Sequence, residues 1–146
     1  MSLLPMRGTD KYGSGAYGAS RGQRTHKGID LACYPNTRIT LSLIGIETVG
    51  KVTKIGLPYA EHPEYKYVQV TTPNDVDVRV FYVTPMVKVG EFIDADTVLG
   101  ISQNLQIIYP GITSHTHIEI KKGTDFLDPK KYINGRLEKD LQLITV

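Results

Sequence analysis

The chain has 146 residues, of which 40% are hydrophobic and 22% charged, and its formal net charge is +2. This length and composition suit one folded domain and exclude a disordered chain or a fibre. Positive and negative charges are nearly balanced, so the composition does not indicate a basic surface for nucleic acid. The single cysteine excludes an internal disulfide. No apolar run reaches the roughly 20 residues of a membrane span.

The first part of the chain is rich in glycine. Residues 7–28 hold six glycines among Ser, Arg and Tyr, without a helical or strand period. The sequence therefore predicts a long, turn-rich loop, and such loops in small domains are often functional.

From residue 28 onward, short β-rich segments alternate with turns. Segments rich in Val, Ile, Thr, Tyr and Phe are predicted as strands at 28–32, 38–43, 50–55, 67–71, 78–83, 97–101 and 115–121. Only residues 137–143, near the end of the chain, indicate a short helix or a loose tail. The predicted fold class is mostly β, with one domain of antiparallel sheet.

Two histidine patterns indicate chemistry. His26 and Asp30 stand four residues apart at the edge of a predicted strand, with Gly28 between them. His115 and His117 stand two apart in another strand, where side chains two apart point to the same face.

These side chains together match a metal donor set. Zinc accepts histidine nitrogen and carboxylate oxygen, and its catalytic sites keep one position open for water. Non-haem iron also uses two histidines and a carboxylate. Taken alone, His115 and His117 would be an exposed pair on a solvated strand face, and the His26–Asp30 spacing is one that occurs often by chance.

The sequence resembles the zinc endopeptidases of the lysostaphin and LytM type, the M23 family. The motifs that carry the resemblance occur at 17–21, 26–32, 82–100, 114–120 and 128–133. The resemblance covers roughly residues 13–133 and leaves 134–146 as a C-terminal tail.

The resemblance implies a twisted antiparallel β-sheet with a loop-walled groove, of the duplicated-hybrid-motif type, and a single zinc ion. The implied substrate is the peptide part of bacterial peptidoglycan. By position, His26, Asp30 and His117 match the zinc ligands. His115 matches a catalytic histidine that takes a proton from the zinc-bound water and later donates it to the leaving amine.

One position departs from the family pattern. Thr84 stands where a second catalytic histidine is expected, and its hydroxyl can donate a hydrogen bond but cannot carry a positive charge. His62, in a loop predicted to wall the groove, is either a substitute or a solvated loop histidine. Tyr17 either helps to hold an oxyanion or packs as a groove-lining aromatic residue.

Two further readings concern cysteine and basic residues. Cys33 and His115 would form a cysteine hydrolase if Cys33 were the nucleophile, and otherwise Cys33 is a small buried hydrophobic residue. Arg21, Arg24 and Lys27 either meet substrate carboxylates or are ordinary surface charge.

Three functions follow as hypotheses. The first is a zinc endopeptidase that cuts peptidoglycan stems or cross-bridges. The second is a catalytically impaired relative that binds cell wall or regulates another hydrolase, and the third is a structural part of a phage tail. We expect action on the cell wall, from the periplasm, from outside or from a virion. No signal segment is visible in residues 1–6, so the protein acts inside the cell, leaves by another route such as a viral particle or cell lysis, or is made with a leader that this sequence does not include.

Overall fold

The computed structural model describes residues 3–21 and 24–133. The predicted tail with its segment 137–143 lies outside these residues. Within the described part, no helix is long and apolar enough to cross a membrane. The elements are β1 (Ser20–Arg21), β2 (Arg24–Thr25), β3 (Ile29–Ala32), β4 (Arg38–Ile39), β5 (Gly50–Gly56), β6 (Tyr67–Thr71), β7 (Val76–Phe81), β8 (Val83–Pro85), β9 (Phe92–Ile93), β10 (Gly100–Ser102), β11 (His115–Lys122) and β12 (Asp125–Leu127), with short 3₁₀ turns η1 (Leu105–Ile107) and η2 (Pro129–Lys131).

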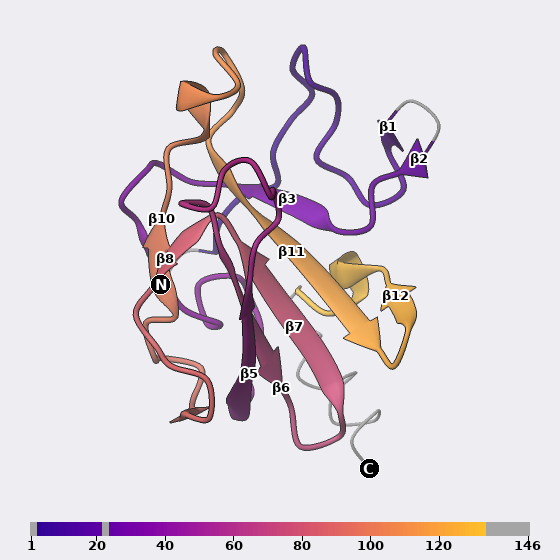
Figure 1. Cartoon of the computed structure of the whole chain (residues 1–146). Helices are drawn as coiled ribbons and strands as arrows, with labels where there is room; N and C mark the ends of the chain where they lie inside the picture. Colours follow the sequence, from indigo (N-terminus) through magenta and orange to yellow (C-terminus); the bar gives the residue numbers. More distant parts are fainter. Residues whose placement is uncertain (1–2, 22–23, 134–146) are drawn as a thin grey trace.

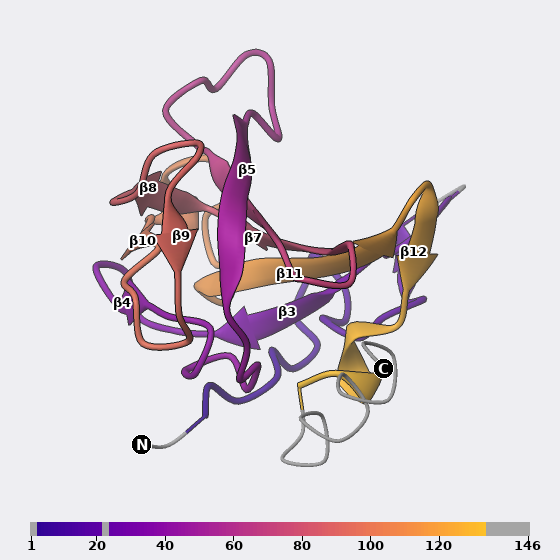
Figure 2. The ribbon, with the colours of Figure 1, turned by 90° about the horizontal axis from the view of Figure 1, so that it is seen from below.

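A seven-stranded antiparallel sheet forms the body of the molecule. Its order is β12-β11-β7-β6-β5-β9, and β3 pairs with β11 off this path (Figure 1). In Figure 2, β5 stands upright whereas β11 and β3 run across the view, so the sheet is strongly twisted. The predicted fold class, a mostly β domain with a twisted antiparallel sheet, is confirmed.

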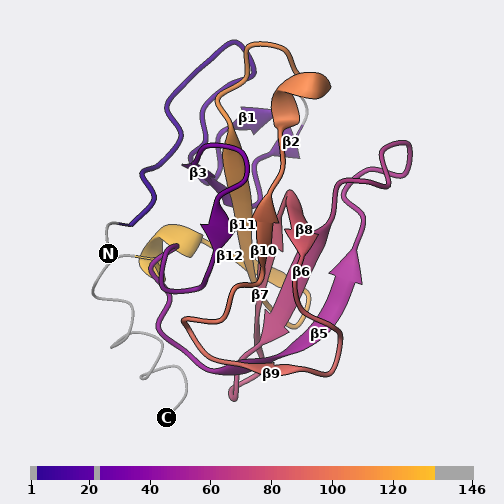
Figure 3. The same ribbon diagram turned by 90° about the vertical axis from the view of Figure 1, so that its left-hand side faces the viewer.

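Two smaller sheets complete the fold. Strands β4, β10 and β8 form a three-stranded sheet, and β1 and β2 form a hairpin. Figure 3 shows the segment 57–66 projecting beyond β5 and β6. In Figure 1, the loop with η1 and the N-terminal loop rise above the end of the sheet where β11 begins. These loops surround the site described below.

The alternation along β11 separates core from site. Ile118 and Ile120 are fully buried in the hydrophobic core. The odd-numbered residues His115, His117 and Glu119 point to the opposite face, because successive side chains of a strand alternate between faces. One strand therefore anchors the sheet and presents three titratable groups side by side.

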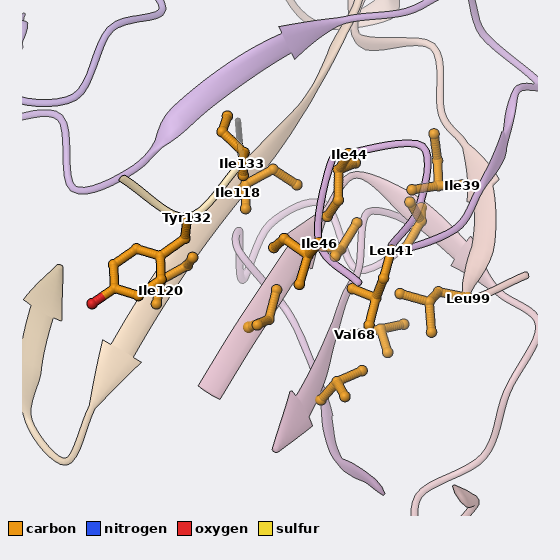
Figure 4. Close-up of a cluster of buried hydrophobic side chains, with 14 of the residues drawn as sticks. Ile39, Leu41, Ile44, Ile46, Val68, Leu99, Ile118, Ile120, Tyr132 and Ile133 are labelled. Carbon is orange, nitrogen blue, oxygen red and sulfur yellow. The ribbon is translucent and has the colours of Figure 1, made fainter. Parts of the chain in front are cut away.

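The core lies against one face of the large sheet. Its apolar side chains come from the sheet, from the segment 39–46 and from the chain that follows β12 (Figure 4). Those labelled in Figure 4 are Ile39, Leu41, Ile44, Ile46, Val68, Leu99, Ile118, Ile120, Tyr132 and Ile133. All ten are buried, so this layer supplies much of the apolar burial that stabilises the fold.

Four predicted strands agree with the structure to within one residue at each end, at 28–32, 50–55, 67–71 and 115–121. The predicted strand 38–43 is wrong beyond Ile39, because the chain turns there. Gly45 donates its N–H to the Ser42 carbonyl at 3.0 Å and has a φ of 90°, in the region that favours glycine. The loop predicted for 7–28 also contains the β1–β2 hairpin.

Two other predicted strands were placed inexactly. The segment 78–83 is broken at Tyr82, whose φ of 68° ends β7 and begins β8 after one residue. The segment 97–101 becomes a strand only at Gly100, since the Thr97 N–H closes a turn onto the Asp94 carbonyl at 3.3 Å. Strand-type composition predicted both regions, but local turns decided their ends.

Replacing Leu99 by Ala tests the core. Leu99 is completely buried, so the truncation removes apolar contacts and leaves a cavity, and we expect a loss of about 2–5 kcal/mol in the free energy of unfolding. Urea denaturation measures it. The matched control is Ile107→Ala, at a side chain that is 75% exposed, where we expect a change within about 0.5 kcal/mol. Equal effects of the two substitutions would contradict this placement of the core.

Candidate metal centre

Pairing between β3 and β11 assembles the site. In their antiparallel register Asp30 lies opposite His117, so a carboxylate and an imidazole from distant parts of the chain become neighbours. His26 reaches them from the segment just before β3. Gly28 makes this approach possible, because a Cβ there would lie 2.9 Å from Nε2 of His117 and would also collide with the Ile118 carbonyl oxygen.

Three donor atoms converge at this point. His117 Nδ1 lies 2.8 Å from Asp30 Oδ1 and 2.9 Å from His26 Nε2, and His26 Nε2 lies 3.2 Å from Asp30 Oδ1. All three side chains are buried. Zinc–ligand bonds of 2.0–2.1 Å in a tetrahedron imply ligand separations of about 3.3 Å, so the three atoms are close to metal-ligand spacing.

The remaining histidine nitrogens are already committed. His26 Nδ1 lies 3.0 Å from the Ala16 carbonyl oxygen, and His117 Nε2 lies 3.0 Å from Glu119 Oε2. Both oxygens only accept, so the protons belong on these outward nitrogens and the inward nitrogens present lone pairs. Lone pairs that meet a carboxylate oxygen at about 3 Å need a cation between them. The three residues could therefore hold a metal ion.

His115 stands beside this cluster in a different role. Its Nδ1 donates to the Thr113 carbonyl at 2.7 Å, and its Nε2 lies 3.5 Å from Asp30 Oδ2. Burial lowers the pKa of His115 below its ordinary value, and this outweighs the opposing attraction of the Asp30 carboxylate. His115 is thus held as a neutral imidazole with a lone pair facing the centre, which suits a proton acceptor.

Electrostatics keep Asp30 ionised. Burial alone would raise its pKa, but the contacts with His117 and His26 outweigh that effect and hold the pKa of Asp30 well below its usual range. For His117 burial opposes the charged form, yet its contacts with Asp30 and Glu119 raise its pKa.

A cavity of about 400 Å³ opens over the centre. Besides the polar groups above, Arg7 and Lys27 line it. The rest of the lining is aromatic and aliphatic: Tyr12, Pro58, Tyr59, Phe81, Tyr82, Leu105, Tyr109 and Ile112. The hydroxyls of Tyr59 and Tyr82 lie 3.0 Å apart, and the Tyr82 ring packs edge-on against His115. Burial raises the pKa of Tyr82 to about 12, so at neutral pH its hydroxyl remains protonated and able to donate a hydrogen bond.

The structure brings together His26, Asp30, His115 and His117, which the sequence predicted as ligands and base. Thr84 is placed elsewhere: it is exposed on β8, and the polar partner of its hydroxyl is the Gln103 side-chain nitrogen at 3.4 Å.

The accessory candidates from the sequence also lie outside the residues that line the cavity. His62 pairs with Glu64 at 3.2 Å and is partly exposed, and Tyr17 is exposed. Burial raises the pKa of Cys33, which disfavours a reactive thiolate.

Among the basic residues, Lys27 does line the cavity, and its ammonium lies over the Phe126 ring at 4.8 Å. The side chains of Arg21 and Arg24 lie outside the described part of the structure.

Sequence reasoning missed several residues of the site. Glu119 continues the period-two alternation of His115 and His117, so that pattern could have indicated it. Nothing local indicated Arg7, which pairs with Asp30, or Tyr82, which a backbone kink turns toward the cavity. Arg7 also lies outside the predicted 13–133 core, although it packs against β3.

Comparison with solved structures defines the class: this is the M23 peptidase fold. The peptidase lysostaphin from Staphylococcus simulans matches with a TM-score of 0.62 at 15% identity, over 94% of this chain and 55% of that one. The catalytic domain of the prophage-encoded M23 protein EnpA from Enterococcus faecalis matches with a TM-score of 0.61 at 19% identity, over 83% and 90%. The chain spans about half the length of lysostaphin.

Sequence comparison is more specific. Leukocyte cell-derived chemotaxin-2 of Mus musculus is 33% identical over 128 residues, which cover 88% of this chain and 79% of that protein. The chain belongs to the M23-like family of leukocyte cell-derived chemotaxin-2. No protein-family model matches it.

Replacing Gly28 by Ala tests the close approach of the segments. The added methyl group collides with the His117 ring and the Ile118 carbonyl, so we expect a loss of about 1–3 kcal/mol in unfolding free energy together with weaker metal binding. Denaturation and zinc titration measure the two effects. Gly8→Ala is the control, because nothing lies within 4 Å of a Cβ there. A Gly28 variant that behaved like the Gly8 variant would contradict the geometry.

Replacing Asp30 by Asn tests the buried charge in the metal-free protein. Because the folded state lowers the pKa of Asp30, ionisation stabilises the fold above about pH 4 and this stabilisation is lost as the pH falls further. We expect the variant to be about 3–5 kcal/mol less stable at pH 6, with the gap starting to narrow below about pH 4 and shrinking further as the pH falls. Urea denaturation with a chelator measures it against the exposed-site control Asp125→Asn. A gap independent of pH would contradict the assignment.

Proposed function

We propose that the protein is a zinc-dependent endopeptidase that hydrolyses peptide bonds of bacterial peptidoglycan. The observation that carries this proposal is the set of inward-facing lone pairs on His26, Asp30 and His117 beside a neutral His115. A ligand cluster with a separate proton acceptor at its edge is what metal-assisted hydrolysis requires.

The donor set and the fold favour zinc. Two imidazoles and one carboxylate are a set of three protein ligands that catalytic zinc sites use, and their separations suit its short bonds. Bound zinc would supply Lewis acidity, which polarises the scissile carbonyl and makes water more acidic. The peptidases of the same fold support hydrolysis rather than redox chemistry.

His115 would move the protons of the reaction. The Thr113 carbonyl holds the proton on Nδ1, so Nε2 is free to take a proton from attacking water and later return one to the leaving amine. The buried imidazole is neutral at physiological pH, as a general base must be. The protonated Tyr82 hydroxyl, which lines the same cavity, is available as a hydrogen-bond donor to the substrate.

The walls of the cavity suit a peptide substrate. Tyrosine and aliphatic side chains provide apolar contact along an extended chain, and Lys27 adds a positive charge at the side. Such a site would accept the stem or cross-bridge peptides of peptidoglycan. Its place of action would be the cell wall, reached from the periplasm, from outside or from a virion.

A second candidate is a relative without turnover that binds cell-wall peptides, regulates another hydrolase or serves in a phage tail. Two observations favour it. Thr84 lies exposed and outside the cavity lining, so it cannot replace a second catalytic histidine there. The curated relative is named a chemotaxin rather than a peptidase.

Hydrolysis of purified sacculi distinguishes these functions. Sacculi from one Gram-negative and one Gram-positive bacterium are incubated with zinc-loaded protein, and mass spectrometry identifies the released fragments. We expect new amino termini, with release abolished by a chelator and by His117→Ala. His115→Gln should retain zinc and lose about 10²–10⁴-fold in rate.

Two outcomes would contradict parts of this proposal. No release by folded, zinc-loaded wild-type protein would move the binding role to first place. Unchanged release by His115→Gln would remove His115 as the base while leaving hydrolysis in place.

A further inference from the structure

We propose that Arg7 and Asp10 form a buried positioning pair that holds both the metal ligand Asp30 and the base His115. The inference rests on the metal site of the proposed function and concerns residues outside its ligand set. Arg7 is 4% exposed, and it reaches the site from the start of the glycine-rich segment 7–28.

The first contact gives the two carboxylate oxygens of Asp30 different partners. Arg7 donates through Nη1 to Oδ2 at 2.7 Å, whereas Oδ1 faces His26 and His117. With Oδ2 occupied by a guanidinium, Asp30 offers a single oxygen to a metal ion. Arg7 would thereby keep the carboxylate monodentate and its orientation constant.

The second contact extends the pair to His115. Arg7 donates through Nη2 and Nε to the two oxygens of Asp10, at 2.6 and 3.2 Å. Asp10 Oδ2 also accepts the Thr113 backbone N–H at 2.9 Å, and the carbonyl of Thr113 is the acceptor for His115 Nδ1. One short chain of hydrogen bonds therefore runs from the ligand Asp30, through the pair, to the base.

The backbone around Arg7 is fixed as well. Its N–H donates to the Asp30 carbonyl at 2.8 Å, and Met6 pairs with Leu31 in an isolated β-bridge. A Cβ on Gly15 would lie 2.8 Å from the Arg7 Cβ and 3.1 Å from that of Asp30, so the three residues are in direct contact. The guanidinium is thus delivered by a locked segment rather than by a free side chain.

Charge and position make opposite predictions for the loss of Arg7. If only charge mattered, removing a cation beside Asp30 would leave a more strongly negative site and tighten zinc binding. If Arg7 orients Asp30, its removal weakens zinc binding although the repulsive charge is gone. Metal affinity therefore separates a positioning role from simple electrostatics.

The test compares Arg7→Met, Arg7→Lys and the control Arg38→Met, which alters an exposed arginine on β4. Zinc affinity is measured by competition with a chelator, and the visible spectrum of the cobalt(II)-substituted protein reports coordination number. We expect Arg7→Met to bind zinc 10–100-fold more weakly. Its cobalt spectrum should weaken as Oδ2 becomes free to coordinate. Arg7→Lys should recover part of the affinity, and Arg38→Met should match wild type.

The outcomes separate this inference from the proposed function. Wild-type zinc affinity and an unchanged cobalt spectrum in a folded Arg7→Met protein would overturn the positioning role and leave the zinc site intact. Tighter zinc binding would also overturn it, in favour of electrostatics alone. A wild-type protein that binds no zinc would overturn both. Zinc binding without peptide hydrolysis would refute the enzyme proposal. Zinc affinity and the cobalt spectrum would still decide the positioning role, because neither of them measures activity.

Discussion

The pairing of β3 with β11 is the contact on which the site depends. The register that sets Asp30 opposite His117 also sets Ile29 opposite Ile118, so the same ladder closes the core on one face and assembles the ligand cluster on the other. A shift by one residue would exchange these faces, placing isoleucine in the cavity and charge in the core. Burial of apolar side chains thus enforces the geometry of the polar ones.

A buried polar cluster is stable only when its groups satisfy one another. Asp30 is enclosed by His26, His117 and Arg7, and each of these has a second partner that fixes it. Glu119 is the second partner of His117, and Asp10 is the second partner of Arg7. The second hydrogen-bond partner of each histidine determines which ring nitrogen carries the proton. The other ring nitrogen then directs its lone pair toward the centre.

Tyr82 adds a contribution from the backbone. A bulky residue with a φ of 68° is strained, at a cost on the order of 1–3 kcal/mol, and such strain is commonly found at functional sites. Backbone bonds to Lys66 and Gln103 hold the kink in place. The kink directs the Tyr82 ring to the cavity wall beside His115 and restarts the strand as β8, with Thr84 facing solvent.

Local spacing in the sequence determined much of this protein. The His115–His117 alternation, the glycine between His26 and Asp30 and the β-branched segments predicted the sheet and four residues that the structure brings together, because side-chain direction within one strand follows from a period of two. Tertiary structure alone decided the rest. Arg7 and Asp30 are 23 positions apart in the sequence, and no local sequence pattern predicts their contact. The position of Thr84 outside the cavity lining likewise depends on the kink at Tyr82. The period-two alternation of a strand does not indicate where that strand is interrupted.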